Sequence, residues 1–309
     1  MIQHFAVTET EENFRLDVFL AEKLETPRSQ AQKLIKGGKV KVNEAVVEKS
    51  SLKIVLDDNI EVISPDLQPT TYNLQPPKLD VLFEDSDVLV INKPAGLLVH
   101  RVGPDDTTPT LVDALLAHDQ QIAKVGDDPE ERPGIVHRLD KMASGILVVA
   151  KNQPAFEYLK NQFATRTAKK EYLALVYGQF KQPCGQINFR IGRSTRTGKM
   201  VAKPEGSEEG KEAVTEFDVI EQFATTALLQ VRIKTGRTHQ IRAHLQAFNH
   251  PIVGDLLYRN KKMTNIRPIK LDRLFLHAAK LTITLPNGET KTFEATLPEE
   301  LENLLKELN

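Results

Sequence analysis

Asp140 is the residue whose type and surroundings most directly suggest chemistry. It stands in the segment RPGIVHRLDKMASGILVVAKN, shortly after His137 and Arg138 and ahead of a long apolar run. A carboxylate can act as a nucleophile or a base, and a neighbouring guanidinium keeps it ionised in a desolvated pocket. An aspartate near a loop more commonly closes a turn or caps the next segment, and the residues by themselves leave that interpretation open.

Two more segments contain residues that could act together with this aspartate. The segment RTAKKEYLALVYG places Tyr172 on an alternating strand beside Lys169 and Lys170. In the segment KTGRTHQIRAHLQAFNHPIVGD, a glycine-containing turn leads into a helix whose buried stripe is flanked by Arg237 and Arg242. Taken singly, the tyrosine fits a core position and each arginine fits a surface ion pair. These residues therefore indicate a catalytic site only when they are considered together.

The charges of the chain are segregated although they nearly cancel, to a formal net charge of -1. Between Arg132 and Lys203, 14 lysines and arginines face three acidic residues, a net charge of +11. By the same count, residues 28–53 carry +5 and residues 232–273 carry +8. Basic surfaces of this kind can neutralise phosphates, which indicates a nucleic-acid partner whose binding depends on salt. A solvated charged face is the alternative.

Length and composition bound the class of protein. A chain of 309 residues with 40% hydrophobic content can form one large core and a small accessory module. The N-terminal sequence lacks a basic region followed by an apolar stretch, and no apolar run is long enough to span a bilayer. The one cysteine, Cys184, can form neither an internal disulfide nor a thiolate metal site by itself. We expect a soluble, cytoplasmic protein that binds no membrane.

A proline-rich segment divides the chain. Residues 64–78, SPDLQPTTYNLQPPK, contain four prolines and no apolar periodicity, which predicts a linker between one domain at 1–63 and another at 79–309. The elements expected in the first domain are helices at 16–24 and 28–36 and short strands at 40–42, 45–47 and 60–63.

The second domain mixes strands and helices without regular alternation. One helix is expected to begin with Thr108 as its cap and Pro109 as its first residue, and Asn287-Gly288 predicts a hairpin. The helix after the third segment's turn is expected to bury Ile241, Leu245 and Phe248. Other expected elements are strands at 145–151, 169–178, 227–234, 281–285 and 290–296 and a helix at 154–166. This order predicts an α+β fold, with a mixed, mostly antiparallel sheet flanked by helices.

Several other chemistries fit the residues poorly. A zinc deaminase needs an H-x-E and a P-C-x-x-C motif, but no second cysteine follows Cys184. His239 and His244 are five residues apart instead of the four that align two ligands on a helix, so packing or phosphate binding is expected there, not a metal site. A glycosidase needs a second carboxylate across the scissile bond, so Asp140 by itself does not fit that class. Nucleotide-dependent enzymes need a glycine-rich phosphate loop, which this chain lacks.

Residues 13–63 resemble the RNA-binding module named after small-subunit ribosomal protein S-four. The resemblance is carried by a helix pair followed by short strands, with RSQAQKLIKGGKVKVN at its centre. In that module the second helix and the next, basic strand lie along an RNA backbone. The residues to which the resemblance assigns phosphate contacts are Arg28, Ser29, Lys33, Lys36, Lys39 and Lys41. A small helix-strand domain that binds protein is the alternative.

Residues 80–300 closely resemble the RluA-type family of RNA pseudouridine synthases. HRLDKMASGILVVAKN matches the family's catalytic motif, KKEY its tyrosine motif and GRTHQIRAHL its arginine motif. RLFLHAAKLTI matches the last apolar motif, and NKPAGLLVH is a further hallmark. With the N-terminal module included, nearly the whole chain resembles the longer, RluD-like members. The resemblance implies the pseudouridine synthase fold and an isomerase that uses no cofactor.

The resemblance also implies roles for single residues. Asp140 would be the catalytic carboxylate, Tyr172 the aromatic residue against the target base, and Arg242 the partner of Asp140. Arg138 would fill the gap left by the extruded base. Further residues expected at the substrate are His137 and Leu276, the latter beside the catalytic pair, and those expected to bind RNA around the site are Lys169, Lys170, Arg237 and His239.

Pseudouridine formation breaks the N1–C1′ bond of uridine, turns the base and joins C5 to C1′, so the nucleotide must leave its helix. The resemblance implies large-subunit ribosomal RNA as the substrate. Transfer RNA is the alternative substrate, because shorter relatives act there, and a non-catalytic RNA-binding factor in ribosome assembly is the alternative function. No obligate protein partner is expected.

Overall fold

Two units make up the chain, residues 1–74 and 75–309, and each is described by itself. In the computed structural model the described residues are 2–8, 11–24, 28–63, 76–101, 108–204, 206–259 and 268–308, without the side chains of residues 2, 28–30 and 33. The predicted linker at 64–78 falls mostly outside the described residues, so its limits stay predictions.

The described part of the first unit is a four-stranded antiparallel sheet with two helices packed on it. Its strands are β1 (Ile2–Ala6), β2 (Val40–Val42), β3 (Ala45–Val46) and β4 (Asn59–Ile63), and its helices are α1 (Leu16–Lys23) and α2 (Arg28–Lys36). Leu16, Phe19 and Leu20 recur at helical spacing, and this face of α1 is buried in the core. Asn43 and Glu44 join β2 to β3 with positive φ angles of 49° and 68°, the backbone that suits a two-residue hairpin.

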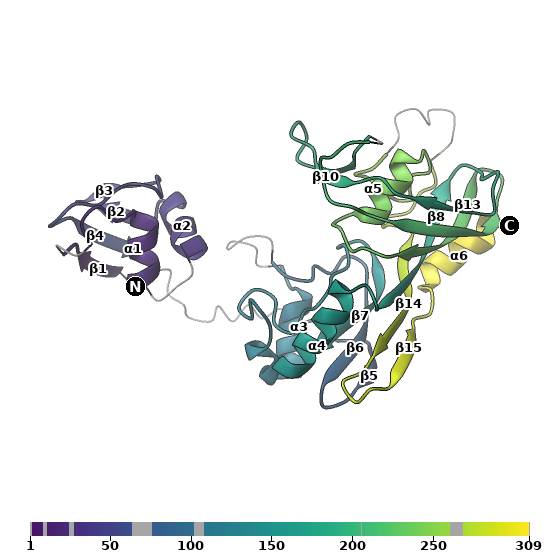
Figure 1. Cartoon of the computed structure of the whole chain (residues 1–309), viewed down its shortest axis with the longest axis horizontal. Coiled ribbons are helices and arrows are strands. Elements are labelled where there is room, and N and C mark those ends of the chain that lie inside the picture. The colour runs from purple at the N-terminus through teal and green to yellow at the C-terminus, as the bar shows by residue number, and fades with distance from the viewer. Residues whose placement is uncertain are drawn as a thin grey trace. The chain divides into compact units, whose positions relative to one another are not determined.

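The described part of the second unit is built on a nine-stranded sheet in the order β5-β6-β7-β14-β8-β13-β12-β9, with β15 paired to β14 (Figure 1). The strands are β5 (Val81–Glu84), β6 (Val88–Lys93), β7 (Ser144–Ala150), β8 (Lys169–Tyr177), β9 (Cys184–Ile187), β12 (Thr215–Gln222), β13 (Thr226–Ile233), β14 (Leu276–Thr284) and β15 (Thr290–Glu294). A separate hairpin consists of β10 (Ile191–Arg193) and β11 (Met200–Ala202). The mixed sheet with its helices confirms the predicted α+β class.

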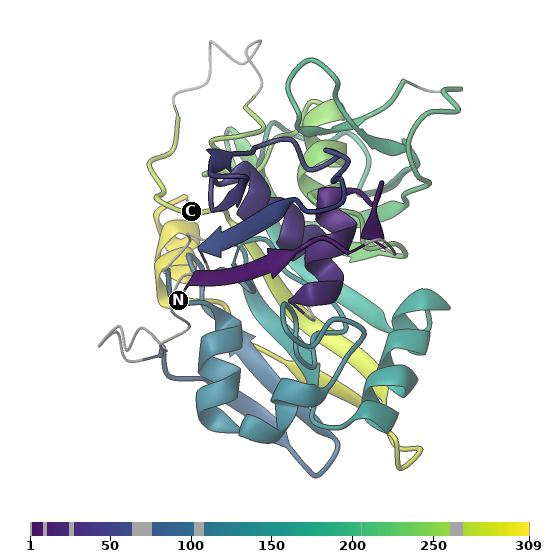
Figure 2. The same ribbon diagram turned by 90° about the vertical axis from the view of Figure 1, so that its left-hand side faces the viewer.

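Helices cover this sheet at both ends. Those in the described residues are α3 (Leu111–His118), the 3-10 helix η2 (Gln120–Lys124), α4 (Gln153–Ala164), α5 (Gln240–Ala247) and α6 (Glu299–Leu308). In both views α3 and α4 lie beside the β5 to β7 end, where Phe156 and Leu159 share one apolar cluster with Val148 (Figure 1, Figure 2). At the other end, α5 packs against β11 and β12. None of the helices in the described ranges combines the length and the apolar character needed to span a bilayer.

Two local predictions are wrong. The N-cap of α3 is Thr110 instead of Thr108: its hydroxyl accepts from the Asp113 N–H at 3.3 Å, and the Asp113 carboxylate accepts from the Thr110 N–H at 2.8 Å. This reciprocal capping box outweighs the signal of a proline at the first helical position. Phe248 is 40% exposed instead of buried: its N–H still donates to the His244 carbonyl at 2.9 Å, but its ring lies at the surface beside the rings of Phe217 and His250.

The centre of the sheet depends on a close approach between β7 and β14. These strands are parallel, with His277 opposite Ser144 and Ala278 opposite Gly145, whereas all other pairings of the sheet's described strands are antiparallel. Gly145 has a φ of 112°, and a Cβ atom there would lie 2.6 Å from the Ala278 nitrogen. Glycine permits both the backbone conformation and the approach.

We predict that Gly145→Ala lowers the free energy of unfolding by about 3 kcal/mol, because the methyl group clashes with β14 and the backbone is strained. Urea unfolding of the whole protein, followed by circular dichroism, measures the loss.

The matched control for this substitution is Gly288→Ala. Gly288 also has a positive φ, 89°, but no atom lies within 4 Å of the added Cβ. Its variant should lose only about 1 kcal/mol. Equal losses in the two variants would contradict a tight approach of β7 to β14.

Candidate active site

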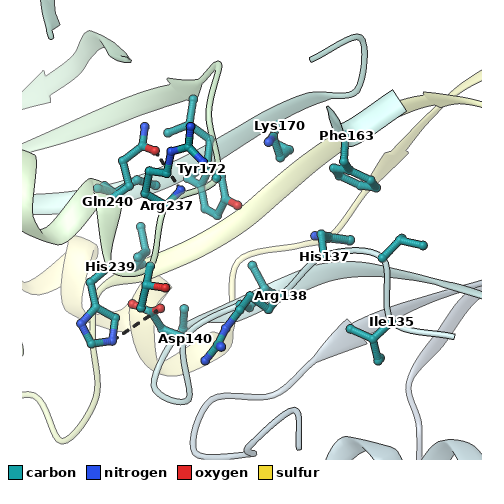
Figure 3. Close-up of a pocket in the computed structure, with 18 of the residues that line it drawn as sticks. Ile135, His137, Arg138, Asp140, Phe163, Lys170, Tyr172, Arg237, His239 and Gln240 are labelled. Atoms are coloured by element: carbon teal, nitrogen blue, oxygen red, sulfur yellow. Dashed lines mark hydrogen bonds and ion pairs between the residues drawn. The ribbon is translucent and has the colours of Figure 1, made fainter. Parts of the chain in front are cut away.

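Asp140 lies on a turn that leads into β7, and its carboxylate faces a cavity (Figure 3). The Ala143 N–H donates to the Asp140 carbonyl at 3.1 Å and closes the turn. The Gly96 N–H donates to the Lys141 carbonyl at 2.8 Å and holds the same turn from a second segment. The backbone of Asp140 therefore shapes the turn, whereas its side chain, 16% exposed, is available to the cavity.

Arg242 of α5 forms an ion pair with Asp140, its Nη1 donating to Oδ2 at 3.0 Å. Its Nε and Nη2 donate to the two carboxylate oxygens of Asp255, at 2.7 and 3.0 Å. The Asp255 side chain is fully buried, and the ring of Tyr258 covers the guanidinium, with 4.9 Å between the ring centroid and Cζ. Although burial opposes it, the contact with Asp255 raises the pKa of Arg242. The guanidinium is thus a fixed cation between two acids.

Tyr172 of β8 is buried at the side of the cavity (Figure 3). It lies opposite Ala278 of β14 and Val231 of β13, so its backbone is held from both sides. Burial, together with the negative charge of Asp140, raises the pKa of the Tyr172 phenol above its usual range. The ring can pack against a base, but the phenol stays protonated at neutral pH.

The turn before α5 is held by one buried amide. Gln240 Oε1 accepts from Thr235 Oγ1 at 2.7 Å and from the Arg237 N–H at 3.1 Å. Gln240 Nε2 donates to the Val214 carbonyl at 3.0 Å, which ties the turn to the end of β12. His239, the N-cap of α5, has a left-handed backbone with φ of 55°. Arg237 and His239 both line the cavity (Figure 3).

A cavity of about 440 Å³ joins these residues. Arg138 and Leu276 also line it, and within the described part of the chain no hydrogen bond or ion pair holds the exposed Arg138 side chain. Lys170 lines it too, with its Nζ 5.6 Å from the Phe163 ring centroid, and burial lowers the Lys170 pKa. Lys169 is exposed and is absent from the cavity wall, because successive residues of a strand face opposite sides.

His137 forms part of the cavity wall and is tied to the backbone. Its Nε2 accepts from the Val148 N–H at 3.0 Å, and its ring stacks on Phe163 with 4.5 Å between centroids. Burial, with a smaller contribution from Lys170, lowers the pKa of His137 to about 3. The imidazole is therefore neutral, and one of its two nitrogens is occupied.

Both ring nitrogens of His244 are engaged by protein atoms. Its ring nitrogens contact Thr215 Oγ1 at 2.9 Å and the Phe189 carbonyl at 2.8 Å. Across the described ranges, no group of three or more His, Cys, Asp or Glu side chains is arranged to hold a metal ion.

Three residues that organise the site escaped the sequence reasoning: Gln240, Asp255 and Tyr258. Asp255 carried a usable signal, because it is one of two acids in the basic segment 232–273, just as Asp140 is a rare acid in its own segment. Gln240 and Tyr258 carried none, because an amide and a phenol at these positions do not reveal the hydrogen bonds that they form in the folded chain.

In the first unit, Lys36 and Lys39 are exposed, whereas Lys41 Nζ donates to Glu61 Oε1 at 2.9 Å. The other predicted RNA contacts, whose side chains lie outside the described residues, are Arg28, Ser29 and Lys33.

Comparison with known proteins finds a matching family for each of the two units. Residues 87–247 match the family described as RNA pseudouridylate synthase, and residues 14–60 match the S4 domain. The chain is 40% identical over 293 residues to an RNA pseudouridine synthase of Synechocystis sp. that is itself uncharacterized, with 94% of this chain and 88% of the relative covered. It is 37% identical to the ribosomal large subunit pseudouridine synthase D of Zymomonas mobilis, with 98% and 96% covered.

Among solved structures, the human RNA pseudouridylate synthase domain containing 4 is 27% identical and matches with a TM-score of 0.58, covering 74% of this chain and 92% of that one. The chain therefore belongs to the RNA pseudouridine synthase family, a family of isomerases, and carries an S4 domain at its N-terminus.

We predict that the His137 ring does not titrate between pH 5 and pH 8, because its pKa in the folded chain is about 3. In the unfolded chain the pKa is about 6.5, so below that pH the unfolded chain binds more protons. The contribution of His137 to stability is complete above about pH 6.5 and is lost as the pH falls toward 3.

Two-dimensional NMR of the histidine rings, with the His137 signal assigned through His137→Asn, measures this titration. A His137 signal with a midpoint near its ordinary value would contradict the neutral, backbone-bound ring.

Proposed function

We propose that Asp140 is the catalytic carboxylate of this pseudouridine synthase and that the cavity around it holds the target uridine. The observation that carries the proposal is the 3.0 Å contact between Asp140 and a guanidinium that Asp255 holds in place. This guanidinium supplies the counter-charge that a carboxylate requires in a partly desolvated pocket. As a nucleophile or base, Asp140 would act on the sugar or the base of the uridine.

The uridine has to leave its helix to reach Asp140, which costs stacking and pairing energy. Arg138 is exposed at the cavity and has no partner within the described residues, so its guanidinium can enter the gap left in the RNA. The neutral ring of Tyr172 would pack against the extruded base, and Leu276 would complete the apolar wall. Lys170, Arg237 and His239 would meet the RNA around the opening.

Large-subunit ribosomal RNA is the substrate that we propose, and the cytoplasm is the place of action. The support is the relative from Zymomonas mobilis, which is named for the large subunit and matches 98% of this chain. The first unit would add a second RNA contact through its basic residues, with domain limits at 1–63 and 79–309 and a linker between them. The protein would select its uridine by recognising the shape of the RNA over a whole surface.

We predict that Asp140→Asn lowers pseudouridine formation by at least about 10³-fold, because an amide of the same shape can act neither as a nucleophile nor as a base. RNA affinity should be unchanged. Pseudouridine mapping in ribosomal and transfer RNA, from cells that lack the gene and carry either form, measures the first quantity, and filter binding measures the second.

Glu294→Gln is the matched control, because it removes a carboxylate that forms only a surface ion pair with Lys280. It should restore modification fully. Pseudouridine made by Asp140→Asn would remove Asp140 as the catalyst, and ribosomal sites that persist without the gene, together with loss of transfer-RNA sites, would overturn the proposed substrate.

We predict that Lys36→Gln combined with Lys39→Gln weakens RNA binding and lowers the slope of log K against log salt by about 2, one for each lost phosphate contact. Lys41→Gln is the control, because Glu61 already balances the Lys41 charge, and its slope should change less. Binding measured between low and physiological salt checks this. Equal slopes in the double variant and the unaltered protein would refute these phosphate contacts.

A further inference from the structure

Pseudouridine formation includes a proton transfer that Asp140 does not explain by itself. Once C5 of the turned base has joined C1′, C5 carries both its hydrogen and the sugar, and C6 is doubly bonded to N1. To restore the aromatic ring, a base must take the C5 proton. The C–H electron pair then forms C5=C6, the C6=N1 pair moves to N1, and N1 gains a proton. The balance needs a proton acceptor and no other reagent.

Tyr172 and Arg242 are poor candidates for this acceptor. Burial raises the pKa of the Tyr172 phenol, so a phenolate is inaccessible at neutral pH. All the polar nitrogens of Arg242 that face the two acids are donors, and a guanidinium has no lone pair to offer. A group with a free lone pair beside Asp140 could take this proton while the carboxylate acts at the sugar.

A chain of hydrogen bonds determines which nitrogen of His239 carries the proton. The Tyr258 hydroxyl donates to the Met200 carbonyl at 2.8 Å, and a carbonyl can only accept. Since the phenol has a single proton, its oxygen must accept in the 3.0 Å contact with His239 Nδ1, which is therefore the N–H of the ring. In the neutral imidazole, Nε2 is left with a free lone pair.

The free nitrogen of His239 lies where the reaction would take place. Nε2 is 3.9 Å from Asp140 Oδ1, and the side chain is 27% exposed and lines the cavity (Figure 3). The left-handed backbone of His239, with φ of 55°, aims the ring from the start of α5 across to the aspartate. Such a conformation is unusual for a residue other than glycine and is often found at functional sites.

We propose that His239 is a second catalytic residue, whose Nε2 accepts the C5 proton of the rearranged base. The resulting imidazolium would be stabilised by Asp140, and the same proton, or one from water, would reach N1. Burial lowers the pKa of His239 and Arg242 adds to this shift, so the ring is neutral before the transfer, while the negative charge of Asp140 opposes the shift and would stabilise the imidazolium. The inference rests on the proposed place of Asp140 at the reacting sugar.

The test uses single-turnover kinetics on transcripts of large-subunit ribosomal RNA that carry hydrogen or deuterium at C5 of uridine. His239→Gln and His239→Asn each lack an acceptor for the proton. We expect both to slow pseudouridine formation by about 10²-fold and to show a primary C5 isotope effect larger than that of the unaltered protein, because C–H cleavage becomes the slow step. Single-turnover rates at saturating protein remove any change of RNA affinity at His239 from the comparison.

The two variants separate catalysis from structure. Asparagine adopts the left-handed backbone readily, and its amide nitrogen can replace Nδ1 as the donor to Tyr258, so the local fold is kept. A rate for His239→Asn equal to that of the unaltered protein, or a slow rate without the larger isotope effect, would overturn the proposal. Asp140→Asn, measured alongside, tests the proposed function by itself, because activity in that variant would count against Asp140 whatever the histidine variants do.

Discussion

One guanidinium between two carboxylates is the interaction on which the site depends. Arg242 gives Nε and Nη2 to Asp255 and has only Nη1 left for Asp140. Asp140, Arg242 and Asp255 together carry one negative charge in excess. Hydrogen bonds from the Leu257 and Tyr258 N–H groups to Asp255, at 2.9 and 3.0 Å, help to stabilise this charge. Removing one member of a buried charged group costs about 3–5 kcal/mol, since the charge left behind has no partner. The guanidinium therefore fixes the position of Asp140 and supplies its counter-charge.

The sheet brings the members of this site together through its register. Gly145, Ala278 and Tyr172 lie opposite one another on β7, β14 and β8, so the turn that bears Asp140 and the tyrosine reach the same end of adjacent strands. Helix α5 brings Arg242 to this end, because the Gln240 amide donates to the Thr215 hydroxyl at the start of β12. The geometry of the candidate site thus depends on strand pairing as well as on the side-chain contacts of Arg242.

Much of this arrangement could be predicted from the sequence, and the exceptions have a common cause. Periodicity located helices α1, α2, α4 and α5 and about half of the strands but missed α6, and the rare acid in a basic segment drew attention to Asp140. The parallel pairing of β7 with β14 could not be predicted, because strand order depends on contacts between segments more than a hundred residues apart. Tyr258 likewise acts through His239 and Arg242, which are distant from it in the sequence, and the sequence marks Asp255 only as a second acid in a basic segment, without the guanidinium that it holds.

Two of the three histidines that line the cavity, His137 and His239, show why residue type alone could not assign their roles. His137 Nε2 faces a backbone donor, the Val148 N–H, so its ring proton must be on Nδ1. His239 Nδ1 faces the Tyr258 oxygen, whose own proton is committed to the Met200 carbonyl, so Nδ1 carries the proton here as well. Both rings therefore have the same tautomer. In His137 the lone pair of Nε2 accepts from the Val148 N–H, whereas in His239 the lone pair of Nε2 is free on the side of Asp140. Backbone hydrogen bonding, which a sequence does not display, decides which imidazole is part of the wall and which can exchange a proton with a substrate.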